Sequence, residues 1–223
     1  ILVLTGVDGS GKTTIARELT KRLIARGYKV RLVWVKSLHT LAFLIYIFYR
    51  RIWGTEYIIN PTRRIVEHYC TEWMKKLKTL WAFIEFISVT PWIIIVHLYN
   101  LMGYLVICDR FLTDFLTTVA LRIKDALWPW KSITGKLIMK IQSRIPTIHL
   151  RISLPTLLSR KPNIEYTLNE LPYLITLYHL IAKYTNAQET LNENKPPKTI
   201  VQNIIRYLLI HLQHKPSARA YQG

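Results

Sequence analysis

The sequence is poor in acidic residues and in cysteine. Only 13 Asp and Glu residues accompany 31 Lys and Arg residues among 223, which gives a formal net charge of +18. The two cysteines, Cys70 and Cys108, lie far apart and without metal-ligand spacing, so we expect buried thiols in a reducing compartment instead of a disulfide framework. The positive charge favours small polyanions, nucleic acid or an anionic membrane surface as partners. Because the basic residues are spread along the chain, general surface solvation is an equal alternative.

Internal repeats, low-complexity linkers and nucleic-acid-binding motifs are all absent. Half of the residues are apolar, which excludes a disordered chain. The length suits one α/β domain, which we expect over residues 1–213, with a disordered tail at 214–223. No basic region precedes the strand-like run Ile1–Thr5, so we expect no signal peptide and a cytoplasmic protein.

Two stretches, Leu38–Tyr49 and Leu80–Ile107, are conspicuously apolar. The second is interrupted by Glu85, Pro91, His97 and Asn100. Its longest run between charged residues, His and Asn is Phe86–Val96, which contains Pro91 and falls short of the roughly 20 residues that a membrane span needs. We therefore expect a buried helix there, with an oligomer interface or a peripheral membrane contact as the alternatives for either stretch.

Short β-rich runs alternate with helical stretches, which predicts an α/β fold with a parallel sheet covered by helices. The expected strands are Ile1–Thr5, Val30–Val35, Tyr104–Cys108, Thr147–Ile152 and Ala187–Leu191. The expected helices cover roughly residues 13–26, 38–52, 61–100 with a break at Pro91, 113–127, 132–143, 155–161, 168–184 and 197–213.

The segment Gly6–Thr13 reads GVDGSGKT and matches the P-loop pattern G-x-x-x-x-G-K-[ST], with a strand before it and a helix after it. Its glycines let backbone N–H groups turn inward around a phosphate, and the helix adds its positive end. Lys12 is expected to reach the β- and γ-phosphates, and the Thr13 hydroxyl to bind Mg²⁺. We therefore predict ATP and Mg²⁺ as cofactors. The residues expected to bind ATP are Gly6, Asp8, Gly9, Ser10, Gly11, Lys12, Thr13 and Thr14.

An Asp-Arg pair closes the expected third strand. Asp109 would lie beside the P-loop, at the edge where open α/β sheets bind ligands, and it could hold Mg²⁺ directly or through water. Arg110 could clamp a phosphate with two hydrogen bonds. The alternative is an ion pair at the end of a strand.

These motifs resemble the thymidylate kinases and their nucleoside monophosphate kinase relatives, whose loop reads G-x-D-G-x-G-K-T-T and whose third strand ends in D-R-[YF]. The resemblance extends to the strand His149–Ile152 and to the short helix that ends at Ser159-Arg160-Lys161. The chain resembles a divergent, archaeal-type member of this family. It implies a P-loop NTPase-type parallel five-stranded sheet in the order 2-3-1-4-5, with helices on both faces. It also implies ATP as donor, a nucleoside monophosphate as acceptor, and a homodimer.

Carried over by position, the resemblance places Asp8 at the acceptor's sugar hydroxyl, Arg110 at its phosphate and Asp109 beside them. Arg160 would belong to a lid over about residues 155–167 that closes on the transferring phosphoryl group, and Lys12, Arg110 and Arg160 would be catalytic.

Several further side chains have two interpretations. Arg160 or Lys161 could be a plain helix-end cation, Asp114 could face the site or only a helix end, and Pro196-Pro197 could shape an adenine loop or only start a helix.

The sequence departs from this family after the second strand, where Lys36-Ser37-Leu38-His39-Thr40 replaces the usual Arg-Glu-Pro-Gly, and at Arg151, where an acid is typical. Candidates for reading the acceptor base are Arg63, Arg64, Tyr69 and Trp73. Glu85 is either an acceptor-site group or a residue at a helix edge in water, the second being favoured. The first expectation is thus transfer from ATP to dTMP. The alternatives are a P-loop kinase for another acceptor, including a lipid-linked one, and an NTP-dependent switch or nucleic-acid-binding module.

Overall fold

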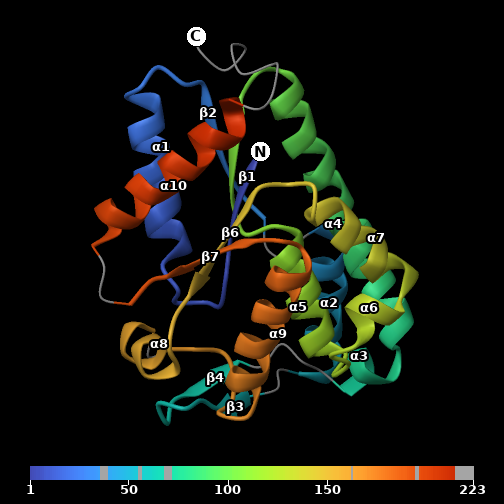
Figure 1. The fold of residues 1–223 in the computed structure, drawn as a ribbon. Helices are drawn as coiled ribbons and strands as arrows, with labels where there is room; N and C mark the ends of the chain where they lie inside the picture. The colour runs from blue at the N-terminus through green and yellow to red at the C-terminus, as the bar shows by residue number, and fades with distance from the viewer. Residues whose placement is uncertain (36–39, 55–56, 68–71, 162, 194–195, 214–223) are drawn as a thin grey trace.

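A five-stranded parallel sheet lies at the centre of the computed structural model (Figure 1). The structure describes residues 1–35, 40–54, 57–67, 72–161, 163–193 and 196–213, so Cys70 and the predicted tail lie outside it. The strands are β1 (Leu2–Thr5), β2 (Val30–Trp34), β5 (Leu105–Asp109), β6 (Thr147–Arg151) and β7 (Gln188–Leu191). Their order is β2-β5-β1-β6-β7. Counted within this sheet alone, that is the predicted order 2-3-1-4-5, because β3 and β4 belong to a separate hairpin.

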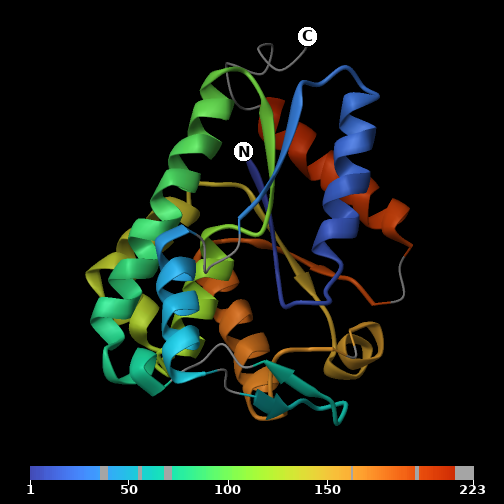
Figure 2. The ribbon, with the colours of Figure 1, turned by 180° about the vertical axis from the view of Figure 1, so that it is seen from behind.

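Helices cover both faces of the sheet (Figures 1 and 2). The helices are α1 (Lys12–Ile24), α2 (Thr40–Trp53), α3 (Glu72–Lys76), α4 (Lys78–Leu101), α5 (Leu112–Arg122), α6 (Trp128–Lys131), α7 (Ile133–Gln142), α8 (Leu154–Arg160), α9 (Glu170–Tyr184) and α10 (Pro197–Gln213). Side chains alternate along β1: Leu2 and Leu4 pack with α1 and α10, whereas Val3 packs with α4, α5 and α7 on the other face. This alternation is the expected one for a strand buried on both sides.

The segment before α3 is a hairpin, so the helix predicted from residue 61 onward is wrong over its first part. β3 (Tyr57–Ile59) pairs antiparallel with β4 (Ile65–Glu67). The buried side chain of Asn60 accepts hydrogen bonds from the backbone N–H groups of Thr62 and Arg64. An Asn side chain that bonds the backbone ahead of it favours a turn over a helix, and the apolar residues on each side then pair as strands.

The predicted helix break at Pro91 is also wrong, because α4 continues through this residue. Pro91 lies on the exposed side of the helix, where the carbonyl that loses its backbone partner can bond to water. The opposite side of α4 packs against β5 and α2 through Trp81, Val89 and Val96.

Glu85 does not lie at a helix edge in water. Its carboxylate is 1 % exposed and forms an ion pair with the guanidinium of Arg122 on α5, which is itself 6 % exposed. The expectation from the sequence, that Glu85 lies at a helix edge in water, is therefore wrong. A charge in this apolar helix is tolerated because a partner on the neighbouring helix neutralises it.

Candidate nucleotide-binding site

The P-loop connects β1 to α1 at the carboxyl edge of the sheet (Figure 1). Gly6, Gly9 and Gly11 all have positive φ angles, of 142°, 97° and 87°. The loop also leaves no room for side chains: a Cβ on Gly9 would lie 2.7 Å from Leu157 Cδ1, and one on Gly11 would lie 2.6 Å from Asn192 Nδ2. The glycines are thus required both by the backbone conformation and by the segments packed around the loop.

The side chain of Lys12 folds back into the P-loop, near whose end it stands in the sequence. Its Nζ donates hydrogen bonds to the carbonyl oxygens of Gly6, at 2.5 Å, and Val7, at 2.9 Å, and lies 3.9 Å from Asp8 Oδ1. Burial, with a smaller contribution from the Arg110 guanidinium, lowers the pKa of Lys12 to about 8. A cation that is held within the loop and poorly solvated is suited to pairing with a phosphate.

This lowered pKa predicts that the affinity for Mg-ATP decreases at alkaline pH. Above about pH 8 the free protein loses the Lys12 proton, whereas the bound polyphosphate requires the ammonium, so binding must take up a proton. The dissociation constant should be constant below that pH and rise by at most about tenfold per pH unit above it. Calorimetric titrations from about pH 6.5 to about pH 9.5 measure this dependence. Lys12→Arg, whose charge persists throughout, is the control; the same slope in both proteins would assign the effect to another group.

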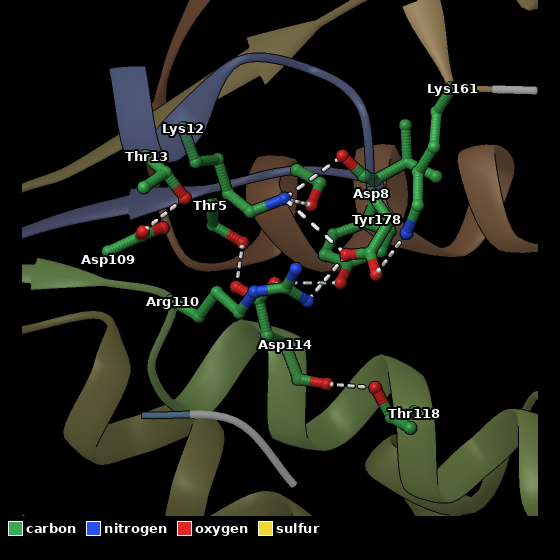
Figure 3. A network of polar contacts seen from close by, with 12 residues as sticks. Thr5, Asp8, Lys12, Thr13, Asp109, Arg110, Asp114, Thr118, Lys161 and Tyr178 are labelled. Carbon is green, nitrogen blue, oxygen red and sulfur yellow. Dashed lines mark hydrogen bonds and ion pairs between the residues drawn. The ribbon is translucent and has the colours of Figure 1, made fainter. Parts of the chain in front are cut away.

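The predicted metal ligands, Thr13 and Asp109, are brought together by the structure. The Thr13 hydroxyl donates a hydrogen bond of 2.6 Å to Asp109 Oδ2 (Figure 3). The other carboxylate oxygen, Asp109 Oδ1, is buried without a hydrogen-bond partner in the described part of the chain. No cluster of three or more His, Cys, Asp or Glu ligands occurs among these residues. One hydroxyl and one carboxylate with spare acceptor capacity fit Mg²⁺, which keeps several waters and takes further oxygen ligands from substrate phosphates.

Arg110 extends from the end of β5 towards the P-loop (Figure 3). One of its terminal nitrogens lies 2.5 Å from Asp8 Oδ1, while Lys161 Nζ approaches Asp8 Oδ2 at 3.3 Å. Arg110 adopts a left-handed backbone with φ of 71°, and its N–H bonds to the carbonyl of Leu4 on β1. An Arg in this conformation is uncommon, and it is held here by the sheet on one side and the ion pair on the other.

Asp114 faces the site. The sequence leaves open whether this residue faces the site or only the end of a helix. Its carboxylate accepts hydrogen bonds of 2.8 Å from the hydroxyls of Thr5 and Tyr178, and it lies 4.0 Å from Arg110. Burial raises the pKa of Asp114, against the opposing effect of the nearby cations Lys12 and Arg110. Thr5 and Tyr178 belong to no phosphate-binding motif, so the sequence gives no signal for their place in the site.

The helix α8 packs directly over the P-loop, as the contact between Gly9 and Leu157 shows. Its last residue, Arg160, does not reach over the loop: its guanidinium donates to the backbone carbonyls of Asn192, at 2.9 Å, and Glu193. The next residue, Lys161, instead makes the contact with Asp8. Both cations border a cavity of about 480 Å³, whose other lining residues are Gly9, Gly11, Lys12, Thr13, Thr14, Ile15, Arg110, Asn192 and Pro197.

The candidate base-reading residues are only partly within the described chain. Arg63 and Arg64 belong to the β3–β4 turn, and Arg64 donates a hydrogen bond of 2.6 Å to Asn163 Oδ1, beside α8. Tyr69 lies outside the described residues, as does the side chain of Trp73. The roles of all four residues therefore stay predictions.

Comparison with known proteins gives a local sequence similarity and a global structural one. No protein-family profile matches the chain. A stretch of 43 residues, 19 % of the chain, is 51 % identical to the signal recognition particle 54 kDa protein of Pyrobaculum neutrophilum; the equivalent protein of Pyrobaculum aerophilum is 54 % identical over the same length. The chain spans about a tenth of the length of these curated relatives.

The structural similarity extends over nearly the whole chain. Thymidylate kinase from Candida albicans superimposes with a TM-score of 0.58 at 15 % identity, over 96 % of this chain and 92 % of that one. Thymidylate kinase from Ehrlichia chaffeensis gives 0.52 at 14 % identity, over 93 % and 97 %. At sequence identities this low, the similarity shows a shared fold and not a shared activity. The chain thus has a fold similar to that of these two thymidylate kinases, at 14–15 % sequence identity.

Proposed function

We propose that this protein transfers the γ-phosphoryl group of ATP to a nucleoside monophosphate, with dTMP as the preferred acceptor. The observation that carries the proposal is the contact of Arg110 with Asp8, at 2.5 Å, beside the P-loop lysine. It joins a phosphate-binding cation on the neighbouring strand to the loop that holds the donor. A kinase needs a cation of this kind for the acceptor phosphate, in addition to the lysine that binds the donor.

The residues divide into a donor side and an acceptor side. On the donor side, the P-loop amides and Lys12 bind the triphosphate, and Thr13 with Asp109 hold Mg²⁺, which neutralises charge on the phosphate oxygens when it is bound. On the acceptor side, Arg110 binds the acceptor phosphate and Asp8 faces the acceptor's sugar hydroxyl. Catalysis then consists of positioning and charge neutralisation, without a covalent intermediate.

Two cations at the end of α8, its last residue Arg160 and the following Lys161, lie close enough to take part. Lys161 already contacts Asp8, whereas Arg160 is bonded to the backbone after β7. We propose that Arg160 and Lys161 form the lid that excludes water from the transferring group. On this proposal, Arg160 exchanges its carbonyl partners for phosphate oxygens when the site is filled.

A panel of acceptors tests the proposal directly. Purified protein with Mg-ATP is incubated with each ribo- and deoxyribonucleoside monophosphate, and the diphosphate products are separated by chromatography. We expect dTDP as the main product. The absence of a diphosphate from every acceptor, above the background of ATP hydrolysis, would refute kinase activity towards nucleotides. Turnover of another monophosphate but not dTMP would refute only the choice of acceptor.

Arg110→Ala separates the two sides of the site. Loss of a charge-assisted hydrogen bond of about 1.5–3 kcal/mol should raise the KM for the acceptor by roughly 10–100-fold and leave the KM for ATP nearly unchanged. Without Arg110, the Asp8 carboxylate still has Lys12 and Lys161 as cationic partners, so the variant should remain folded. Arg26→Ala, which removes an exposed arginine at the end of α1, is the matched control. An equal rise in both KM values would place Arg110 on the donor side instead.

A further inference from the structure

The helices α2 and α4 present a large apolar surface to solvent. On α4 the exposed apolar residues are spaced three, four or seven positions apart and are 43–81 % exposed: Leu80, Phe83, Ile87, Ile94, Leu98 and Leu101. On α2 they are 42–67 % exposed: Leu41, Phe43, Leu44, Ile47, Phe48, Ile52 and Trp53. The two helices contact each other and lie side by side in Figure 2. We call these thirteen residues the α2–α4 face; monomeric proteins rarely leave so large an apolar surface uncovered without a partner for it.

One of the two helices that form the face, α4, is anchored in the fold by polar contacts on its inner side. By length and composition, α4 could cross a membrane, since it has 24 residues and contains an 18-residue stretch with a mean hydropathy of 1.8. Its inner side, however, carries the buried Glu85 paired with Arg122, and a Ser88 hydroxyl that accepts a hydrogen bond from the Ala42 N–H of α2. Crossing a bilayer would expose these polar groups to lipid. The helix is therefore suited to lie on a membrane surface instead of passing through it.

The exposed charges on α2 and α4 themselves are basic, and one of them, Lys78, lies 4.0 Å from Asp125, which follows α5. The sequences of α2 and α4 contain a single carboxylate, that of the buried Glu85. Arg50 and Arg51 are exposed at the end of α2, and Lys76 is exposed just before α4. Figure 2 shows these ends together at the lower edge of the molecule. Exposed Trp53 and Tyr57 lie at the same end, and such aromatic residues are typical of the boundary between lipid and water.

We infer that the α2–α4 face binds the surface of an anionic lipid bilayer, with the two helices in the plane of the interface. Apolar side chains enter the boundary between headgroups and acyl chains, while the basic end pairs with anionic headgroups. A second copy of this chain is the less suitable occupant, because neither helix offers an exposed carboxylate to meet the partner's basic residues. This inference does not depend on the phosphoryl-transfer proposal.

Vesicle sedimentation tests the inference on the intact protein. Phosphatidylcholine vesicles containing about a third phosphatidylglycerol are compared with pure phosphatidylcholine, at low and at high salt. We expect sedimentation with the anionic vesicles, and an affinity at least about tenfold lower for neutral vesicles or at high salt. Failure to sediment with anionic vesicles at low salt would overturn the inference.

Matched variants locate the contact. Leu44→Ser with Phe48→Ser, two residues that are 64 % and 65 % exposed, should weaken vesicle binding by at least about tenfold. Ile210→Ser, at a 50 % exposed position of α10 on the opposite side of the sheet, should leave it unchanged. Because these side chains are exposed, circular dichroism should report an intact fold for each variant. Equal binding by both variants would overturn the assignment to this face. So would a dimer, detected by light scattering without lipid, that dissociates in the double variant and never sediments with vesicles.

Discussion

Replacement of Lys12 by methionine is expected to lower the rate of phosphoryl transfer by about 10³-fold. In the proposed reaction the ammonium is the cation that the P-loop places against the triphosphate, and its loss would remove stabilisation of the charge that develops on the phosphate oxygens. Methionine has a similar length and fills the same buried position, 4 % exposed, without a charge. The effect should therefore be chemical and not structural.

The measurement is kcat with Mg-ATP and the best acceptor of the panel, together with the dissociation constant for Mg-ATP. Lys21→Met, which removes an exposed lysine near the end of the same helix, is the matched control and should keep full activity. Thermal unfolding of both variants shows whether the fold is retained. If Lys12→Met kept more than about a tenth of the wild-type kcat, the P-loop would not be the donor site of the reaction.

Features governed by local sequence could be predicted. The P-loop, the helix that follows it and the five parallel strands each depend on residues that are neighbours in the chain. The contact of Thr13 with Asp109 was also foreseeable, because the carboxyl ends of adjacent parallel strands meet at one edge of the sheet. Cys108 is buried and free, as expected for a cysteine in a central strand.

Features that depend on residues distant in the chain could not be predicted from the sequence. The turn at Asn60 depends partly on its side-chain hydrogen bond to the carbonyl of Ile164, on the segment after α8, and no sequence periodicity indicates such a contact. The three-residue strands β3 and β4 are also too short for a clear alternating pattern. Arg160 was expected to act as a lid residue, whereas its hydrogen bonds in the structure are set by the course of the chain after β7. Tyr178 joins the site only because α9 packs against α5.

The ion pair of Glu85 with Arg122 is the clearest example of a distant partner, and it should also dominate the response of stability to mutation. Arg122→Met is expected to lower the free energy of unfolding by about 3–5 kcal/mol, because it leaves a buried carboxylate without its cation. Urea denaturation followed by circular dichroism measures this loss. The corresponding decrease in Tm is roughly 6–20 °C for a chain of this length.

The double variant Glu85→Leu with Arg122→Met separates the contribution of the pair from the cost of breaking it. With both charges replaced by apolar side chains of similar size, most of the lost stability should return, since burying the pair also carries a desolvation cost. The ion pair of Arg22 with Glu18, at 2.7 Å and about 30 % exposed, provides the surface control: Glu18→Leu should cost less than about 1 kcal/mol. If Arg122→Met were no more costly than Glu18→Leu, water would have to reach Glu85. If the double variant were as unstable as Arg122→Met alone, the pair itself would contribute stability that apolar packing cannot replace.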